Sequence, residues 1–256
     1  MTRPLVLLSN DDGYAAPNLV ALSQALATFA DVVVCAPEGN QSATSHALTL
    51  HRVLRLKQAA DNIFYVDGTP ADCVYVALHS GDRILSRPPT LCVSGMNHGL
   101  NLGLDVFYSG TVAAAREAAL RGIPSLAVSA DSKADRTAAA AAGARVARAL
   151  ADAAAAGAPP VLLNINVPPG SGDWKLRATR LGHRSYGGEV VFRTDPRGGE
   201  YLWIGGSNPT HHDAPGSDTE AYDAGEIGVT PLALDLTGAG AEPVASEVVA
   251  RIAGLR

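Results

Sequence analysis

Short apolar segments alternate with amphipathic stretches along the first two-thirds of this sequence, and this pattern restricts the fold more than any other feature. Residues 5–8 (Leu-Val-Leu-Leu), 32–35 and 91–93 are continuously apolar, as strands buried on both faces of a sheet are. Between the first two segments, Pro17 begins a stretch with the apolar spacing of a helix. Because strands that alternate with helices form a parallel sheet, the sequence predicts an α/β fold with a doubly wound, mostly parallel sheet.

The same alternation continues to residue 167. Residues 48–56 and 63–66 have a period near two, which indicates an antiparallel pair, and residues 95–110 have the composition of a glycine-rich loop. We expect the remaining elements of this part in the order helix from Pro70, helix 112–121, strand 126–128, helix 138–156 and strand 161–167.

The segment after residue 167 has a different pattern. Residues 174–180 and 201–204 look like strands of an antiparallel extension, and residues 195–199 supply the chemistry of a tight turn between two strands. Residues 207–217 have loop composition, and residues 242–255 have the apolar spacing of a closing helix. The chain is therefore predicted to be a single domain with an α/β core (about 1–167), a hairpin extension with loops (about 168–241) and a closing helix (about 242–256).

Charge and composition exclude several functional classes. The chain has 20 Lys and Arg against 25 Asp and Glu, a net charge of −5, and 5% aromatic residues, so we expect no nucleic-acid polymer as a partner. No apolar segment is long enough for a membrane span, and the run before Ser9 is too short for a signal peptide. Cys35, Cys73 and Cys92 lie in apolar segments, which predicts buried free thiols and favours a reducing cytoplasm.

Two adjacent carboxylates follow the first predicted strand. Asp11 and Asp12 lie in residues 9–13 (Ser-Asn-Asp-Asp-Gly), at the sheet edge where ligands of doubly wound folds bind. Hard divalent cations prefer such oxygen ligands. A plain turn is the alternative, because Asn, Asp and Gly are common turn residues. A P-loop is excluded, since no Gly-Lys-Ser or Gly-Lys-Thr sequence follows this strand.

Two further loops follow predicted strands. Residues 36–45 are rich in hydroxyl and amide groups that can orient a metal or a phosphate, although a solvated loop has the same composition. Residues 94–105 have glycines at every fourth position, with Asn97 and Asn101 as neutral oxygen donors. This spacing differs from the dinucleotide fingerprint, so it does not predict NAD binding. Its glycines allow the backbone to approach a ligand closely, and a purely structural loop is the alternative.

The third loop leads into a predicted helix start at Ser109, Gly110 and Thr111. Free amides and the macrodipole make such a start an anion-binding site. Neither Ser109 nor Thr111 has Glu or Gln three residues later, so no capping box competes for these amides, although either hydroxyl can still cap the helix. A hard cation beside an anion-binding helix start suggests phosphoryl transfer to water.

The histidines and cysteines indicate no zinc site and no thiol nucleophile. His211 and His212 are adjacent in a loop, and the sequence has no His-x-x-x-His pattern. Cys73 and Cys92 have no neighbouring motif that marks a catalytic cysteine. We therefore base the chemistry on oxygen ligands.

Several motifs together resemble the SurE family, the stationary-phase survival proteins, and these matches cover nearly the whole chain. They are Ser-Asn-Asp-Asp-Gly (9–13), Gly-Thr-Pro-Ala-Asp-Cys-Val (68–74), Ser-Gly-Met-Asn (94–97), Tyr-Ser-Gly-Thr-Val-Ala-Ala (108–114), Asn-Ile-Asn-Val-Pro (164–168), Asp-Pro-Arg-Gly (195–198) and Thr-Pro-Leu (230–232).

The resemblance implies a metal-dependent phosphatase that hydrolyses nucleoside 5′-monophosphates, with a Rossmann-like core and a C-terminal hairpin that helps to form homodimers or homotetramers. It implies one divalent cation per subunit, magnesium or manganese, and some members of the family also accept 3′-nucleotides and short polyphosphate. By the matching motifs, the metal ligands are Asp11, Asp12, Ser42 and Asn97, and the phosphate-binding residues are Asn97, Ser109, Gly110 and Thr111.

Two positions depart from the family pattern. Ala43 follows Ser42 where the family usually has glycine, and Gly228 stands where serine is common. The first departure affects the backbone of the loop that carries Ser42.

Our mechanistic hypothesis is that Asp11 and Asp12 are the catalytic residues and that one of them orients a nucleophilic water or accepts its proton. Direct attack by an aspartate, which gives a phosphoaspartate, is the competing mechanism. Two other functions are a haloacid-dehalogenase-like phosphotransferase and a nucleotide-sensing module without turnover. The adjacent carboxylates argue against the first, which needs Asp-x-Asp, and only an assay separates the second.

Overall fold

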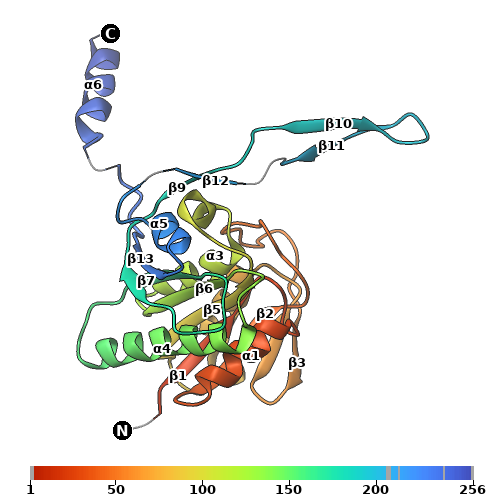
Figure 1. Ribbon diagram of the computed structural model, residues 1–256, viewed down its shortest axis with the longest axis vertical. Coiled ribbons are helices and arrows are strands. Elements are labelled where there is room, and N and C mark those ends of the chain that lie inside the picture. The colour runs from red at the N-terminus through yellow and green to blue at the C-terminus, as the bar shows by residue number, and fades with distance from the viewer. Residues whose placement is uncertain (1–2, 206–208, 213, 239, 255–256) are drawn as a thin grey trace.

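A nine-stranded mixed sheet with helices on both faces forms the body of the molecule (Figure 1). The computed structural model describes residues 3–205, 209–212, 214–238 and 240–254. The strands are β1 (Leu5–Ser9), β2 (Asp31–Pro37), β3 (Leu56–Ala60), β4 (Ile63–Val66), β5 (Leu91–His98), β6 (Ser125–Ala130), β7 (Leu162–Val167), β8 (Leu176–Ala178), β9 (His183–Ser185), β10 (Val190–Thr194), β11 (Glu200–Ile204), β12 (Thr210–His212) and β13 (Ile227–Leu232). The helices are α1 (Pro17–Leu26), α2 (Pro70–His79), α3 (Gly110–Ala119), α4 (Arg136–Ala155), α5 (Asp218–Asp223) and α6 (Glu242–Ala253), with short 3-10 turns at Gly81–Arg83 and Gly103–Phe107.

The order of strands in the main sheet is β3-β4-β2-β1-β5-β6-β7-β13-β8. Strand β1 pairs in parallel with β2 on one side and with β5 on the other, so the connections wind in opposite directions from β1. The point between β1 and β5 is therefore the topological switch, where doubly wound folds bind ligands. Strands β3 and β13 each pair antiparallel with a neighbour, β4 and β7, which makes the sheet mixed. The predicted fold class is confirmed.

The core lies in layers on both faces of the sheet. Leu5 and Leu7 of β1 pack in a cluster with side chains of α2 and α3, whereas Val6 and Leu8 pack in a cluster with α1 and α4. All four side chains are buried, which explains why this strand reads as a continuous apolar run. Full burial of one leucine stabilises the fold by about 2–3 kcal/mol.

The predicted elements of the core are present, with two corrections. The antiparallel pair exists, but its first strand is β3 (Leu56–Ala60) rather than residues 48–56. The backbone at Thr49 leaves the sheet because its N–H and hydroxyl both donate to the Asp72 carboxylate, at 2.8 and 2.6 Å. The predicted loop 95–110 is also partly regular, since β5 continues to His98 and Gly103–Phe107 form a 3-10 turn.

Gly95 explains how β5 can continue into this loop. Its φ is +136°, and a Cβ there would lie 2.3 Å from the Val128 carbonyl oxygen of β6. The register between β5 and β6 shifts between Gly95 and Asn97. A glycine is therefore required for β5 to pair closely with β6 while it turns Asn97 toward the edge of the sheet.

The C-terminal part contains the predicted antiparallel hairpin, but its first strand was misplaced. The turn at residues 195–199 connects β10 to β11, and the Asp195 carboxylate accepts the N–H groups of Arg197 and Gly199. The predicted strand 174–180 is the short strand β8, which pairs with β13 in the main sheet. Part of the predicted loop 207–217 is β12, which pairs with β9, while residues 206–208 and 213 lie outside the described residues.

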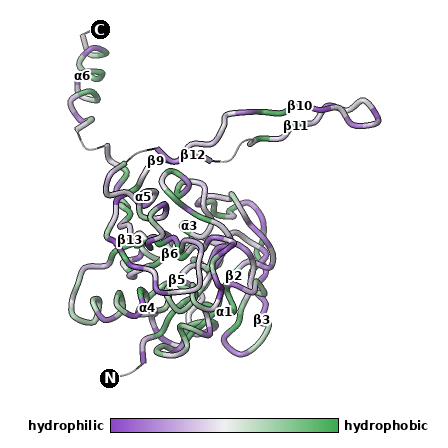
Figure 2. Tube along the Cα trace, in the orientation of Figure 1, coloured by the Kyte–Doolittle hydropathy of each residue, from purple (hydrophilic) through white to green (hydrophobic). Residues whose placement is uncertain are grey.

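The hairpin β10–β11 and helix α6 extend away from the body (Figure 1). Helix α6 forms where predicted, but none of its residues is buried, so it does not close the core of this chain. Figure 2 shows apolar segments along the hairpin and α6 as well as inside the sheet. No helix in the described part of the chain is both long and apolar enough to cross a bilayer.

Candidate active site

Loops from the carboxyl ends of β1, β2 and β5 meet at the switch point of the sheet. Asp11 and Asp12 follow β1, Ser42 lies in the loop after β2, and Asn97 is near the end of β5. Asp11, Ser42 and Asn97 border a pocket of about 320 Å³, whereas Asp12, Gly110 and Thr111 are not among its lining residues. The pocket is lined by Asp11, Ser42, Ala43, Asn97, His98, Gly99, Leu100, Asn101, Asp105, Tyr108, Ser109 and Tyr186. The loops that the sequence singled out therefore share one cavity.

Asp11 is a buried carboxylate against the start of α3. The Thr111 hydroxyl donates to its Oδ1 at 2.5 Å. A Cβ on Gly110 would lie 2.9 Å from the Asp11 Cβ, so only glycine allows the helix to pack this closely. Burial raises the pKa of Asp11 to about 6; the Asp12 charge adds to this shift, and the Thr111 hydrogen bond opposes it.

Asp12 lies on the outer side of Asp11 and is held by two donors. Its Oδ2 accepts the N–H of His98 at 3.1 Å, and its Oδ1 accepts the Asn40 amide at 3.4 Å. Among the described residues, neither Asp11 nor Asp12 forms an ion pair with a basic side chain. Two adjacent carboxylates without a basic partner favour binding of a cation.

The remaining predicted ligands are neutral oxygens. The Asn97 amide nitrogen donates to the Gly99 carbonyl at 3.0 Å, which orients the side chain and leaves its amide oxygen available to a ligand. Ser42 lines the pocket, and its N–H donates to Asn40 Oδ1 at 2.9 Å. In residues 3–205, 209–212, 214–238 and 240–254, no cluster of three His, Cys, Asp or Glu side chains is placed to hold a metal. Asp11, Asp12, Ser42 and Asn97 offer carboxylate, hydroxyl and amide oxygens, the kind of donor that a hard divalent cation prefers.

The loop that carries Ser42 has a strained backbone and is bonded to the body of the molecule. Ala43 and Ser45 have φ values of 59° and 52°, in the left-handed region that glycine prefers. The Ser45 hydroxyl donates to the Phe107 carbonyl at 2.6 Å, and His46 contacts the buried Glu117 carboxylate of α3 at 2.8 Å. The left-handed backbone at Ala43 gives a physical reason for the glycine usual in this family, and Ser42 still borders the pocket without it.

The second departure, Gly228, lies in β13 behind the site. A Cβ at this position would lie 3.0 Å from the Thr179 hydroxyl and 3.3 Å from the Asp218 Cα. Thr179 and Thr230 hydrogen bond to each other through their hydroxyls at 2.8 Å. The serine that is common here therefore requires these neighbours to shift.

The start of α3 is capped by Ser109. The Ser109 hydroxyl accepts the N–H of Val112 at 3.0 Å, so the capping alternative is what the structure shows at this residue. Ser109 also lines the pocket. The Thr111 hydroxyl is engaged with Asp11, so the groups of Gly110 and Thr111 that remain suited to an anion are their first-turn amides.

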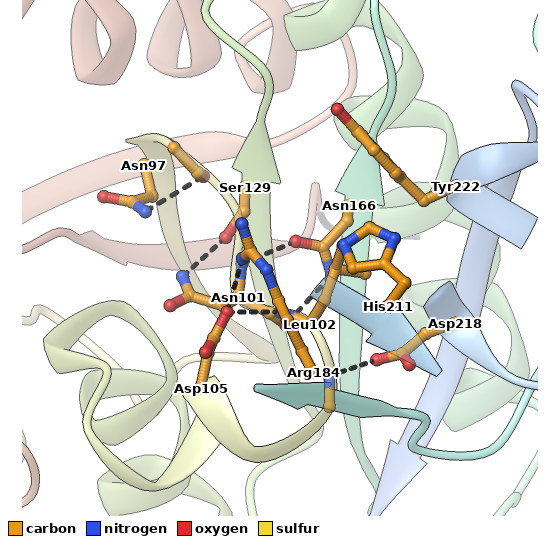
Figure 3. Close-up of polar contacts among 12 residues, drawn as sticks. Asn97, Asn101, Leu102, Asp105, Ser129, Asn166, Arg184, His211, Asp218 and Tyr222 are labelled. Carbon is orange, nitrogen blue, oxygen red and sulfur yellow. Dashed lines mark hydrogen bonds and ion pairs between the residues drawn. The ribbon is translucent and has the colours of Figure 1, made fainter. Parts of the chain in front are cut away.

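A buried asparagine network behind the site was not predicted (Figure 3). The backbone N–H of Asn101 donates to Asn166 Oδ1 and its side chain donates to the Ser129 hydroxyl, both at 2.7 Å. The Asn101 carbonyl accepts the amides of Asn164 and Asn166, at 2.9 and 3.1 Å. These bonds fix the loop between Asn97 and Asp105. The signal in the sequence was two asparagines, two residues apart, in an otherwise apolar strand.

Side chains of the C-terminal extension also reach the site. Arg184 donates to the Asp105 carboxylate at 2.6 Å. The Asp218 carboxylate accepts the N–H groups of Gly103 and Gly182, at 3.0 and 2.7 Å, and burial raises the pKa of this carboxyl. Figure 3 shows Arg184 and Asp218 beside the loop that carries Asn101. Tyr186 is the pocket-lining residue that sequence reasoning missed, because its segment has no regular apolar period.

A larger cavity, of about 490 Å³, lies near the amino ends of β5 and β6. Its lining is mostly apolar, with Arg87 and Arg121 among the polar groups. Ligands of doubly wound sheets bind at the opposite edge, where Asp11 and Asp12 lie. The smaller pocket is therefore the candidate active site.

Comparison with known proteins identifies the family of this chain. Residues 6–188 match the profile of the family described as "Survival protein SurE". The chain is 64% identical over 252 residues to a protein of Sorangium cellulosum named 5′-nucleotidase SurE, covering 98% of this chain and 97% of that protein. A protein of Myxococcus xanthus with the same name is 48% identical, with coverage of 93% and 90%.

Among solved structures, the SurE protein from Aquifex aeolicus superposes with a TM-score of 0.81 at 35% identity, covering 96% of this chain and 99% of that one. The observed fold agrees with these similarities. The resemblance seen in the motifs is confirmed, and the chain belongs to the SurE family.

Proposed function

We propose that this protein is a cytoplasmic 5′-nucleotidase, a metal-dependent phosphatase that converts nucleoside 5′-monophosphates to nucleoside and phosphate. The observation that carries this proposal is the pair Asp11 and Asp12, which lies without a basic ion-pair partner in the described chain, against the start of α3. A cation site beside a helix start suits a phosphate monoester, whose oxygens carry negative charge. The names of the relatives from Sorangium and Myxococcus support the same activity.

In this proposal one set of residues binds the cation and an overlapping set binds the phosphate. Asp11, Asp12, Ser42 and Asn97 hold one divalent cation, magnesium or manganese, which supplies electrophilic activation of the phosphate and of a water molecule. Asn97, the Ser109 hydroxyl and the first-turn amides of Gly110 and Thr111 bind the phosphate oxygens. Their oxygens and amides are fixed before the substrate arrives, because α3, β5 and the asparagine network hold the loops.

Asp12 is the better placed carboxylate for the proton transfer. The hydroxyl of Thr111 and the body of α3 surround Asp11, whereas Asp12 is partly exposed and is oriented by the N–H of His98. We propose that Asp12 orients the attacking water and accepts its proton. A single turnover in oxygen-18 water, with excess enzyme, should place the label in the released phosphate. Label in an aspartate side chain instead would establish a phosphoaspartate.

The test of the function is phosphate release by chelator-treated protein, with and without added magnesium or manganese. The panel contains 5′- and 3′-monophosphates of each base and short polyphosphate, so it also measures the range of substrates. We expect release from 5′-monophosphates only after metal is added, and loss of this release in the variant Asp12→Asn. Nucleotide binding without release under every metal condition would identify a sensing module instead.

We also propose that the protein assembles into a homodimer or homotetramer through its extension. Val244, Val248, Val249 and Ile252 of α6 are all exposed, as are Trp203 and the other large side chains of β11. Exposed apolar surfaces of this kind are typical of protein interfaces. Light scattering should give two or four subunits, and the variant Trp203→Ser should shift the mass downward. A monomer in the unmodified protein would contradict the proposal.

A further inference from the structure

The candidate pocket is larger and more apolar than binding of a phosphate group alone requires. The pocket has a volume of about 320 Å³. Its oxygen groups, which suit a cation and a phosphate, come from Asp11, Ser42, Asn97 and Ser109, but the Tyr186 ring also lines it. Leu100 and Tyr108 also line it. This volume is in the range of pockets that hold a small organic molecule. We therefore expect the apolar lining to contact the nucleoside, the organic part of the substrate to which the phosphate is attached.

Tyr186 is held in place by the pair that joins the extension to the core. The Arg184 guanidinium donates to the Asp105 carboxylate at 2.6 Å, and both side chains are only 11% exposed. The same guanidinium lies 5.3 Å from the centre of the Tyr186 ring. An arginine fixed by a buried carboxylate thus gives the ring a defined position.

Part of the Tyr186 ring is accessible to a ligand, although Arg184 fixes the position of the ring. The residue is 53% exposed and borders the pocket, so the part of the ring that does not contact Arg184 can contact a ligand. Burial and the Asp105 carboxylate raise the pKa of Tyr186 to about 12, so its hydroxyl stays a neutral hydrogen-bond donor at physiological pH. An aromatic ring with a polar tip suits a planar heterocycle that carries acceptor atoms.

We propose that Tyr186 is a specificity-determining residue that stacks on the base of the nucleoside monophosphate. The inference rests on the proposed function, because it names the group that recognises the nucleoside while Asp11 and Asp12 act on the phosphate. Stacking between a base and an aromatic side chain is sequence-tolerant, since every base has a π-face. Tyr186 therefore selects for the presence of a base rather than for one particular base.

The test compares two substrates that differ only by the base. Adenosine 5′-monophosphate and ribose 5-phosphate share the sugar and the phosphate. In Tyr186→Leu we expect the KM for adenosine 5′-monophosphate to rise roughly tenfold at nearly constant kcat, and kcat/KM for ribose 5-phosphate to change less than about twofold. Tyr186→Phe keeps the ring and should restore most of the lost affinity.

The matched control is Tyr75→Leu. Tyr75 is 41% exposed on α2 and has the Arg121 guanidinium 5.5 Å from its ring centre, but it does not line this pocket. Tyr75→Leu should leave the KM for adenosine 5′-monophosphate and the kcat/KM for ribose 5-phosphate unchanged. Equal losses on both substrates in Tyr186→Leu, or an unchanged KM for the nucleotide, would overturn the proposal.

Calorimetric titration of adenosine, which has no phosphate, separates this inference from the proposed function. We expect adenosine to bind the unmodified protein and Tyr75→Leu, and to bind Tyr186→Leu roughly tenfold more weakly. If no phosphate is released from any nucleotide but this difference in adenosine affinity remains, the phosphatase assignment fails and the role of Tyr186 stands. Equal adenosine affinity in both variants overturns the role of Tyr186 whatever the activity.

Discussion

The loops at the carboxyl edge of the sheet and the C-terminal extension both line the pocket, but they are held there in different ways. The loop around Asn101 is fixed by four buried hydrogen bonds to Ser129, Asn164 and Asn166. The extension reaches the same place through the Arg184–Asp105 pair and the bonds of Asp218, while the strands of its hairpin are largely exposed.

This difference separates two tasks. Groups that act on the phosphate need fixed geometry, and strand ends braced by buried polar bonds provide it. Groups that contact the rest of the substrate tolerate more movement, and a segment held by a few side chains opens at lower free-energy cost. We therefore expect changes in the sheet-edge loops to affect chemistry, and changes in the extension to affect binding and local stability.

The largest expected effect is on chemistry. Asp12→Asn removes a carboxylate that we propose as cation ligand and proton acceptor, so we expect kcat to fall roughly 10³-fold in saturating magnesium or manganese. The free energy of unfolding should change little, because Asp12 is partly exposed and contacts loops. The exposed Asp61→Asn serves as the control and should keep full activity. A kcat within about twofold of normal in Asp12→Asn would remove this residue from the mechanism.

The second effect concerns the stability cost of Asp11. Its pKa is raised from 3.8 to about 6 in the folded, metal-free chain, so the folded state binds a proton more tightly than the unfolded state. The contribution of Asp11 to the free energy of unfolding is therefore most favourable below pH 3.8, falls between pH 3.8 and 6, and is lower by about 3 kcal/mol above pH 6.

Asp11→Asn removes this cost and keeps an oxygen that accepts the Thr111 hydroxyl. In chelator, urea unfolding should show the variant more stable by about 2–3 kcal/mol at pH 8 and by about 1 kcal/mol at pH 4.5. The same variant should lose phosphatase activity. A variant that is less stable at pH 8 would show that Asp11 contributes to the fold rather than opposing it.

The third effect tests how the extension is held. Arg184→Leu leaves the Asp105 carboxylate without its basic partner in a site where both side chains are 11% exposed, so we expect a loss of about 2 kcal/mol in stability. The control is Arg177→Leu, since Arg177 pairs with Glu220 and Glu226 at a more exposed place and should cost less than about 1 kcal/mol. Hydrogen exchange should increase around β9 only in Arg184→Leu. Equal effects in the two variants would contradict the difference between core and extension.

The core was easier to predict from the sequence than the C-terminal extension. Residues 5–8 and 91–93 are buried on both faces, and Pro17 and Pro70 begin helices, so local pattern and final structure agree in the core. Asp11 and Asp12 follow a strand in a fold whose ligand edge is known in advance, which placed both at that edge from the sequence, and Asp11 lines the pocket there.

The extension was harder to predict because its packing is not local. The strand β10 was missed, since it has no buried face in this chain to impose a period of two. Helix α6 was predicted to close the core because its apolar spacing is real, but that spacing does not say which surface it meets. Tyr186 and Arg184 owe their roles to Asp105, a residue far away in sequence, and no motif expresses such a contact.

The smallest expected effect lies in the loop of Ser42. Ala43 has a φ of 59°, and a left-handed conformation costs a residue with a Cβ about 1–2 kcal/mol. Ala43→Gly relieves this strain but makes the unfolded chain more flexible, so we expect a net gain of about 0.5–1 kcal/mol in urea unfolding.

Ala47→Gly is the matched control, because Ala47 lies in the same loop and has no left-handed backbone. It should lose about 0.4–1 kcal/mol from the flexibility of the unfolded chain alone. The opposite signs of the two changes would show that strain, rather than loop flexibility, sets the stability at Ala43. If both variants are less stable, the bonds of Ser45 and His46 to the body already hold the loop, and strain at Ala43 contributes nothing to the difference between the two regions.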